Sequence, residues 1–121
     1  VLNRVKHRAF PSTICEVIYE GPLYESWKTR QIPHLPKELR TYYPRRDRCQ
    51  FSWYCDGKSD KPKEQTAFQL AHRLAWLVIN GHVFDFTDGA IFYHADYVNP
   101  KWAKDKQKLF QLDSHIFYRN K

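Results

Sequence analysis

Long apolar runs are missing from this chain of 121 residues. The longest, Leu74 to Ile79, is far shorter than the roughly 18 residues that a membrane-spanning helix requires, so no such helix is predicted. The N-terminus also lacks a charged segment followed by an apolar one, which is the pattern of a secretory signal. The chain opens on Val1 and not on Met, and we expect that an upstream segment has been lost.

Cysteine is scarce and metal-binding motifs are absent. The chain has three cysteines, no CxxC pair and no HExxH segment, so a zinc site is disfavoured and neither a metal nor a cofactor is predicted. Cys49 and Cys55 can form a disulfide bond if their Cα atoms approach to about 6 Å, and such a bond would indicate an oxidising compartment. Cys15 lies in an apolar run, where we expect it to be a buried small hydrophobe.

Acidic residues are outnumbered by basic ones. The chain has 20 Lys and Arg against 13 Asp and Glu, which gives a formal charge of +7. This excess favours an anionic partner, and nucleic acid, an anionic lipid surface and the bacterial cell wall all qualify. The alternative is that the charge only keeps the protein dispersed in solution.

The length predicts a single domain over residues 1–121 with one small core. Residues 1–5 are typical of the end of a helix, because no capping residue precedes them. A second helix is predicted in FPSTICEVIYE, where Ser12 or Thr13 can act as N-cap and Glu16 has the spacing of a capping box.

The middle of the chain combines a basic loop with a long helix. Residues 21–48 hold four prolines and seven Lys or Arg, interleaved with tyrosines and a tryptophan, and predict a long loop. The following helix is predicted to start at Asp60 as N-cap, with Pro62 in its first turn, and to stop at Asn80 and Gly81. Its apolar stripe is predicted to be core and consists of Ala67, Leu70, Ala71, Leu74, Leu77 and Val78.

The last third of the chain predicts strands. HVFDFTDGAIFYHADYV is typical of a hairpin, with strands at 82–86 and 91–98 on either side of the turn TDG. A helix is predicted around 102–112 and a short strand at 115–119. This order of elements predicts an α+β fold with a small antiparallel sheet.

No carboxylate stands out as the acid of a glycosidase. That role requires a carboxylic acid kept protonated near neutral pH, usually by an apolar pocket. Asp85 and Asp88 flank the predicted turn and Glu16 is a capping partner, so these three have structural explanations. His94 and Asp96 share a strand face, but no nucleophile is placed by spacing, so we interpret His94 as a structural or substrate-binding residue.

The segment CQFSWYCDG, residues 49–57, is rich in side chains suited to sugar binding. Gln50, Ser52 and Trp53 offer an amide, a hydroxyl and an indole face, which can hydrogen-bond an N-acetyl group and stack on a sugar ring. A packed turn without a ligand is the alternative. Further along, Phe92 and Tyr93 are predicted to point to opposite strand faces, one toward the core and the other toward a cleft or solvent.

Five blocks of the sequence together resemble the SleB/CwlJ-type cell wall hydrolases, a family that includes spore-cortex-lytic enzymes. They occur in the family's order from Val1 to Arg119 and read VLNRV, FPSTIC, CQFSWYCDG, DGAIFYHADYVNPKW and HIFYR. The resemblance implies a lysozyme-like α+β domain that cleaves the glycan strands of peptidoglycan, as a lytic transglycosylase or a muralytic glycosidase. It also implies a periplasmic, secreted or wall-associated protein, of bacterial or phage origin.

The same resemblance implies where the functional residues lie. The family's catalytic glutamate precedes the helix that ends in VLNRV, so we assign no catalytic residue in this chain, regard it as N-terminally truncated and expect the fragment alone to be inactive. Gln50, Phe51 and Ser52 match the family's glycan-facing QFS, and Tyr93 with His94 match its aromatic-histidine strand. Residues 21–48 are longer than the family pattern.

Two other functions are compatible with the residues. One is a wall-binding module without catalysis. The other is a nucleic-acid-binding domain that uses the basic aromatic loop, whose binding would weaken steeply as salt rises. The resemblance favours peptidoglycan over nucleic acid as the partner.

Overall fold

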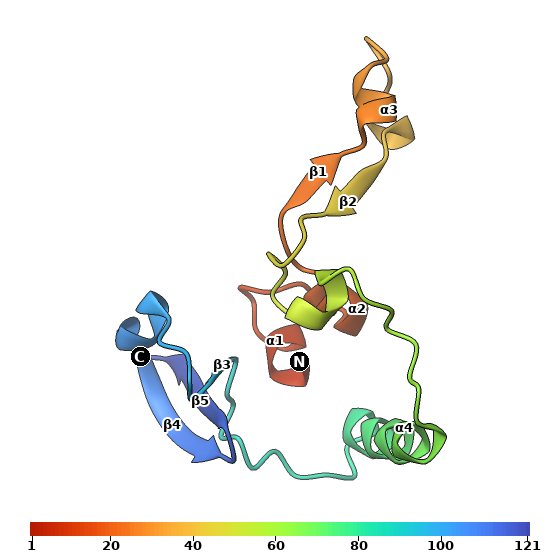
Figure 1. Cartoon of the computed structure of the whole chain (residues 1–121). Coiled ribbons are helices and arrows are strands. Elements are labelled where there is room, and N and C mark those ends of the chain that lie inside the picture. Colours follow the sequence, from red (N-terminus) through yellow and green to blue (C-terminus); the bar gives the residue numbers. More distant parts are fainter. The chain divides into compact units, whose positions relative to one another are not determined.

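The computed structural model describes all residues from Val1 to Lys121. It is a mixed structure of helices and two small antiparallel sheets, which confirms the predicted α+β class (Figure 1). The elements are α1 (Leu2–Val5), α2 (Ile14–Ile18), β1 (Leu23–Glu25), α3 (Trp27–Arg30), η1 (Lys37–Leu39), β2 (Tyr42–Pro44), η2 (Ser52–Cys55), α4 (Gln65–Ile79), β3 (Phe92–Ala95), η3 (Lys101–Asp105), β4 (Lys106–Leu112) and β5 (His115–Asn120).

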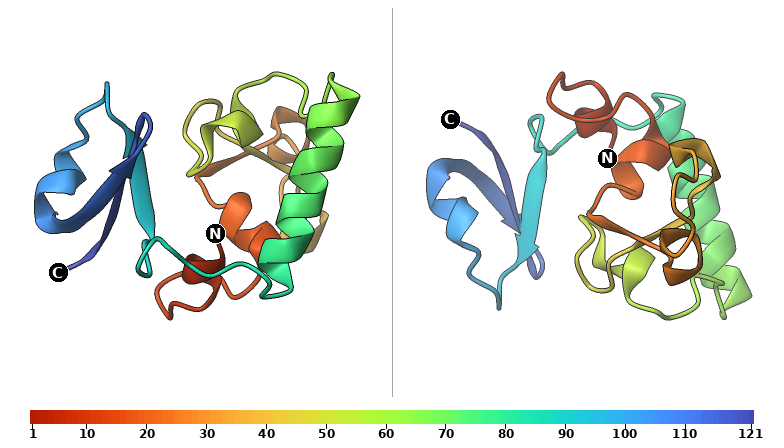
Figure 2. Two further views of the ribbon diagram at one scale, coloured as in Figure 1. Left: turned by 90° about the horizontal axis from the view of Figure 1, so that it is seen from below. Right: turned by 90° about the horizontal axis from the view of Figure 1, so that it is seen from above.

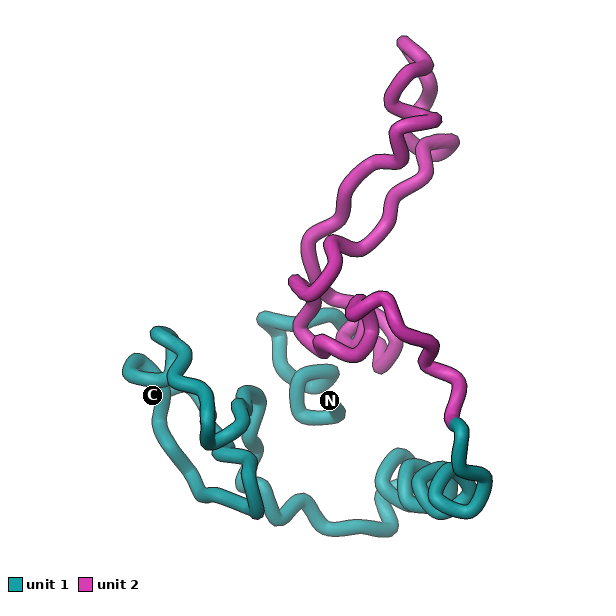
Figure 3. The backbone as a smooth tube through the Cα atoms, viewed as in Figure 1, with its two compact units in different colours: residues 1–12, 63–121 teal, residues 13–62 magenta.

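The chain divides into two compact units. Unit 1 combines residues 1–12 with residues 63–121, and unit 2 consists of residues 13–62 (Figure 3). The candidate residues Gln50, Phe51 and Ser52 belong to unit 2, whereas Tyr93 and His94 belong to unit 1.

Unit 2 begins with the predicted capped helix. The Thr13 hydroxyl accepts a hydrogen bond from the Glu16 N–H at 3.2 Å, which confirms Thr13 as the N-cap of α2. Val17 on this helix is fully buried. Cys15, expected to be buried, is exposed, because it lies on a different side of the short helix from Val17.

The predicted loop at 21–48 is in part regular structure. β1 and β2 form an antiparallel hairpin in which Tyr24 lies opposite Tyr43, with α3 and η1 between the strands (Figure 1). Strands of three residues with prolines nearby give almost no periodic signal, and only the pairing of segments about 20 positions apart defines them.

Unit 1 contains the long helix α4, which starts later than predicted. The Glu64 carboxylate accepts hydrogen bonds from the N–H groups of Thr66 and Ala67, so Glu64 and not Asp60 is the N-cap. The predicted stop is confirmed, because Asn80 is the C-cap and Gly81 follows with a positive φ of 77°.

The apolar stripe of α4 does not form the predicted core. None of its residues is buried, and Leu70 and Leu74 are exposed. Helical spacing determines which side chains share a face, but it does not determine whether another element covers that face. The spacing of the stripe therefore predicts the helix correctly, but the prediction that the stripe is buried is wrong.

The three-stranded sheet of unit 1 has the order β3-β5-β4, with β5 in the centre. The predicted strand at 115–119 is confirmed as β5. The predicted hairpin partner at 82–86 is not a strand, because β3 pairs with β5 instead and the Asp85 side chain organises the turn before β3. The predicted helix at 102–112 is also wrong: η3 ends at Asp105, next to β4, which pairs with β5 (Figure 2).

Candidate functional site

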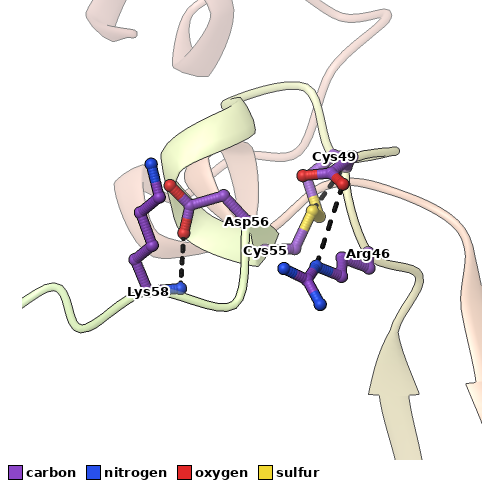
Figure 4. The surroundings of a disulfide bond; sticks show 6 residues. Arg46, Cys49, Cys55, Asp56 and Lys58 are labelled. Atoms are coloured by element: carbon purple, nitrogen blue, oxygen red, sulfur yellow. Dashed lines mark hydrogen bonds and ion pairs between the residues drawn. A yellow bond between two sulfur atoms is a disulfide. The ribbon is translucent and has the colours of Figure 1, made fainter.

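The segment from Cys49 to Cys55 is a braced turn. The two cysteines form a disulfide bond with a Cα–Cα distance of 6.1 Å, and the Cys49 N–H points at the Cys55 Sγ at 3.2 Å (Figure 4). The Gln50 N–H donates to the Glu20 carbonyl at 3.0 Å, and the Asp47 N–H donates to the Cys55 carbonyl at the same distance. These contacts fix the backbone from which the candidate side chains project.

The three candidate residues of this turn have different environments. Phe51 is largely buried and anchors the turn, whereas Gln50 and Ser52 are exposed. Trp53, which follows them, is also exposed, and its ring lies 6.4 Å from that of Phe51. The turn therefore presents an amide, a hydroxyl and an indole to solvent from one short rigid segment.

Glu20 is a feature of this site that sequence reasoning did not single out. Its Oε2 atom is buried and has no hydrogen-bond partner, while the carbonyl of the same residue receives the Gln50 N–H. Buried polar atoms are nearly always hydrogen-bonded, so an unpartnered carboxylate oxygen is unusual. The sequence around Glu20 does not indicate that Oε2 is buried, because the burial of one oxygen depends on tertiary contacts.

Tyr93 belongs to a row of aromatic rings on one face of the three-stranded sheet. It lies opposite Phe117 in the β3-β5 register, with ring centroids 6.0 Å apart. Phe117 stacks on Phe110 of β4 at 5.0 Å, and Phe110 contacts Phe86 at 6.3 Å. Tyr93 is 41% exposed and Phe86 is 62% exposed. We call Tyr93, Phe117, Phe110 and Phe86 the aromatic row.

His94 points to the opposite face of the sheet, as the alternation of side chains requires. Its Nδ1 lies 2.8 Å from the Ala95 carbonyl and its Nε2 lies 2.9 Å from the Tyr118 hydroxyl. Because a carbonyl oxygen can only accept, the neutral ring carries its proton on Nδ1, and Nε2 accepts from Tyr118. Asp96 does not orient this histidine, since its carboxylate instead accepts from Gln111 at 3.3 Å.

The His94 face is the packed side of the sheet. Phe92, on the same face, contacts Phe10 and Trp102, and His94 also contacts Trp102 at 5.6 Å. Tyr118 is buried between them. Phe92 and Tyr93 thus lie on opposite faces as predicted, and the structure separates Tyr93 from His94 instead of bringing them to one surface.

A hydrogen-bond network attaches α1 to the turn before β3. The Asn3 side chain donates to the Asp85 carboxylate at 3.0 Å and to the Ala90 carbonyl at 3.1 Å. The buried Arg4 donates through Nε to the Ile91 carbonyl at 2.6 Å. The network fixes the point at which β3, and with it Tyr93, enters the sheet.

Asp85 is the centre of this network. Desolvation raises its pKa, but hydrogen bonds from the Thr87 hydroxyl and N–H, from Asn3 and from the Gly89 N–H outweigh that effect and lower the pKa to about 2. The expectation that Asp85 is a turn residue is thereby confirmed.

The carboxylates whose pKa departs from its ordinary value all shift in the same direction. The hydrogen bond from Arg40 lowers the pKa of Glu25, and the N–H groups of Ala67 and Thr66 lower that of Glu64. With Asp85, all three shifts favour the ionised form, which is the opposite of what a general acid requires. None of these three carboxylates therefore has the raised pKa that a general acid requires near neutral pH.

The structure thus exposes two sets of side chains that can contact a ligand: an amide, a hydroxyl and an indole on the turn at 49–55, and the rings of the aromatic row on the sheet. The comparison with protein families is specific, since the Cell Wall Hydrolase family matches residues 1–118. The chain belongs to this family, which confirms the resemblance seen in the sequence blocks.

Membership in the family implies peptidoglycan as the substrate and hydrolysis as the activity. It also makes an extracytoplasmic location plausible. Comparison with curated proteins gave no match, and comparison with solved structures gave none either. None of the helices has the length and apolar character needed to cross a membrane.

Proposed function

We propose that this chain holds the glycan strand of peptidoglycan for cleavage, and that each unit contributes its own contact surface: the turn at 49–55 in one unit and the aromatic row in the other. The observation that carries the proposal is the family match over residues 1–118. Two structural features support it: Gln50, Ser52 and Trp53 are exposed on a disulfide-braced turn, and Tyr93 is exposed on a sheet whose rings are already stacked. A preformed aromatic surface binds with little loss of side-chain entropy.

The residues have separate roles in this proposal. Gln50 and Ser52 hydrogen-bond the acetamido and hydroxyl groups of the sugar, while Phe51 holds their turn in place. Tyr93 stacks on a sugar ring, and His94 fixes β3 from the packed face through Tyr118. The net charge of +7 attracts a wall polymer that carries carboxylates.

The proton donor in this proposal is a glutamate that precedes residue 1 in a longer chain, as the family resemblance implies. Within the chain, the carboxylates at positions 25, 64 and 85 have lowered pKa values, which are unsuited to the role. One acid that protonates the glycosidic oxygen is sufficient for a lytic transglycosylase, in which the sugar's own hydroxyl closes the ring. A second carboxylate would be needed for a hydrolase with a separate base or nucleophile.

Binding is tested by sedimentation of the chain with purified sacculi. We expect Tyr93→Ala to weaken binding about tenfold, because loss of one aromatic contact costs about 1.4 kcal/mol. Tyr97→Ala is the matched control, since Tyr97 is 84% exposed and lies outside the aromatic row. Equal binding by the two variants would refute the role of Tyr93.

Cleavage is tested by analysis of the muropeptides released from sacculi. Residues 1–121 alone should bind sacculi and release no muropeptides. The chain extended at its N-terminus should release them, with anhydro ends if it is a transglycosylase and with reducing ends if it is a hydrolase. Release by residues 1–121 alone would show that the acid lies among their own carboxylates.

A wall-binding module without catalysis is the second candidate. It would hold glycan through the same exposed side chains, those of the turn at 49–55 and of the aromatic row, without cleaving it. An extended chain that binds sacculi without releasing muropeptides would establish it. Binding to DNA that is stronger than binding to sacculi, and that weakens steeply with salt, would instead indicate a nucleic-acid-binding domain.

A further inference from the structure

The β1-β2 hairpin carries a structured tip at its far end from the disulfide-braced turn (Figure 1). We define the hairpin tip as residues 27–40, which include α3 and η1. Backbone pairing closes it, since the Ser26 N–H donates to the Thr41 carbonyl at 2.7 Å. It is more than a disordered insertion and requires its own explanation.

Polar contacts keep the hairpin tip in one conformation. Arg40 forms an ion pair with Glu25 at 2.7 Å and donates through Nε to the Leu35 carbonyl at 2.9 Å. The Thr29 hydroxyl donates to the same Glu25 carboxylate at 3.2 Å and accepts from the Thr41 N–H at 3.3 Å. Arg40 is therefore used inside the tip, and the side chains that remain on its surface are presented by a fixed backbone.

Three large apolar side chains are exposed on the hairpin tip. Trp27 is 58% exposed, Ile32 is 48% exposed and Leu39 is 65% exposed. They come from three parts of the tip: α3, the connecting loop and η1. Several exposed large apolar side chains on one small structured element mark an interaction surface, whereas such residues scattered singly need no explanation.

Cations accompany these apolar side chains. Lys28, Arg30 and Lys37 lie on the tip, and none of them is in an ion pair. Glu38 is the only acidic residue between positions 27 and 40. The hairpin tip thus exposes both cations and apolar side chains, and a partner that satisfies both must offer negative charge beside a region into which apolar side chains can be transferred.

This combination distinguishes among anionic partners. A nucleic acid or an anionic wall polymer would satisfy the cations and could stack on Trp27, but it would leave Ile32 and Leu39 in water. At the surface of an anionic bilayer, the headgroup phosphates neutralise Lys and Arg, tryptophan is favoured at the interface, and aliphatic side chains reach the acyl boundary.

We propose that the hairpin tip docks on an anionic phospholipid surface, with Trp27, Ile32 and Leu39 inserted at the headgroup boundary and Lys28, Arg30 and Lys37 on lipid phosphates. The charge complementarity of the tip selects this partner. The inference is independent of glycan binding, because no residue of the tip belongs to the turn at 49–55 or to the aromatic row. Docking would hold the protein at the membrane that borders its substrate.

The test is sedimentation of the whole chain with vesicles of phosphatidylcholine alone and with vesicles that also contain phosphatidylglycerol at about three parts in ten. We expect binding only to the anionic vesicles. Replacing the three cations by glutamine (K28Q, R30Q and K37Q) should weaken it roughly 100-fold, since each Lys or Arg near such a surface contributes about fivefold. The control, K58Q, K61Q and K63Q, removes the same charge outside the tip and should keep most of the binding.

The apolar part of the proposal has its own variant. Leu39→Ser and Trp27→Ser together should abolish vesicle binding while leaving the far-ultraviolet circular dichroism spectrum and sacculus binding unchanged. Tyr93→Ala should have the converse effect: it should weaken sacculus binding about tenfold and retain vesicle binding. Failure of this proposal and failure of the glycan proposal therefore give different results.

Three results would overturn membrane docking. One is the absence of binding to phosphatidylglycerol vesicles, and another is equal binding by the cation variant and its control. The third is loss of sacculus binding in the tip variants, which would assign the tip to the wall polymer.

Discussion

The strongest prediction from this structure concerns the Asp85 network, because it links folding stability to the strand that carries Tyr93. Replacement of Asp85 by Asn preserves the shape of the side chain but removes its charge. The carboxylate accepts hydrogen bonds from three residues, namely Asn3, Thr87 and Gly89. An amide presents a donor in place of one acceptor oxygen, so at least one of these bonds becomes a clash between donors.

The magnitude follows from the pKa. A folded-state pKa of about 2 against the ordinary 3.8 corresponds to about 2 kcal/mol if fully expressed. The side chain is exposed, so solvent screening reduces our expectation to about 1 kcal/mol. Since the folded pKa is the lower one, this stabilisation is complete above the unfolded pKa near 4 and is lost as the pH falls from about 4 toward 2.

The assay is urea unfolding of wild type and Asp85→Asn at pH 7, pH 3 and pH 2. We expect the variant to be less stable at pH 7 by about 1 kcal/mol, with an unchanged urea dependence, and the difference to shrink as the pH approaches 2. Asp60→Asn is the control, because it removes the same charge from an exposed residue without hydrogen bonds to its carboxylate. A difference that is zero at pH 7, or that stays constant between pH 7 and pH 2, would refute the reasoning.

Three further predictions can be measured by the same unfolding assay. Glu20→Gln should raise the free energy of unfolding by about 1 kcal/mol, because it removes a charge whose Oε2 is buried without a partner; a loss of stability would show that the charge is needed. Tyr118→Phe should lower the free energy of unfolding by about 1 kcal/mol, because His94 Nε2 loses its hydrogen-bond donor. A variant as stable as wild type would contradict this prediction. Reduction of the disulfide should lower the free energy of unfolding of wild type by about 2 kcal/mol. The same reducing agent should leave the stability of the control, in which Cys49 and Cys55 are both replaced by serine, unchanged.

Half of the candidate site could be anticipated from local sequence. The sequence indicates the turn at 49–55, because its two cysteines are six positions apart and because it combines amide, hydroxyl and ring side chains. The aromatic row could not be found in this way, since Phe86, Phe110 and Phe117 come from a turn and two strands whose pairing is non-local. Of this row, the family block in the sequence indicates Tyr93 alone.

Adjacency in sequence does not place two side chains on one surface. Tyr93 and His94 belong to one family block, and as neighbours on a strand they point to opposite faces. Tyr93 joins the exposed rings, whereas both nitrogens of His94 are engaged on the packed face. The substrate-binding role of Tyr93 remains a prediction, whereas His94 is expected to act by fixing β3 from the packed face.

The sequence by itself determined the features that depend on a few neighbouring residues: the Thr13 cap of α2, the stop of α4 at Asn80 and Gly81, and the turn at Asp85. In each case a side chain or a positive φ satisfies backbone groups within a few positions, so the signal is local. Only the tertiary structure decided that residues 106–112 form a strand and that the stripe of α4 is exposed. Strand pairing and burial depend on contacts with distant segments, and local propensity is too weak to determine them.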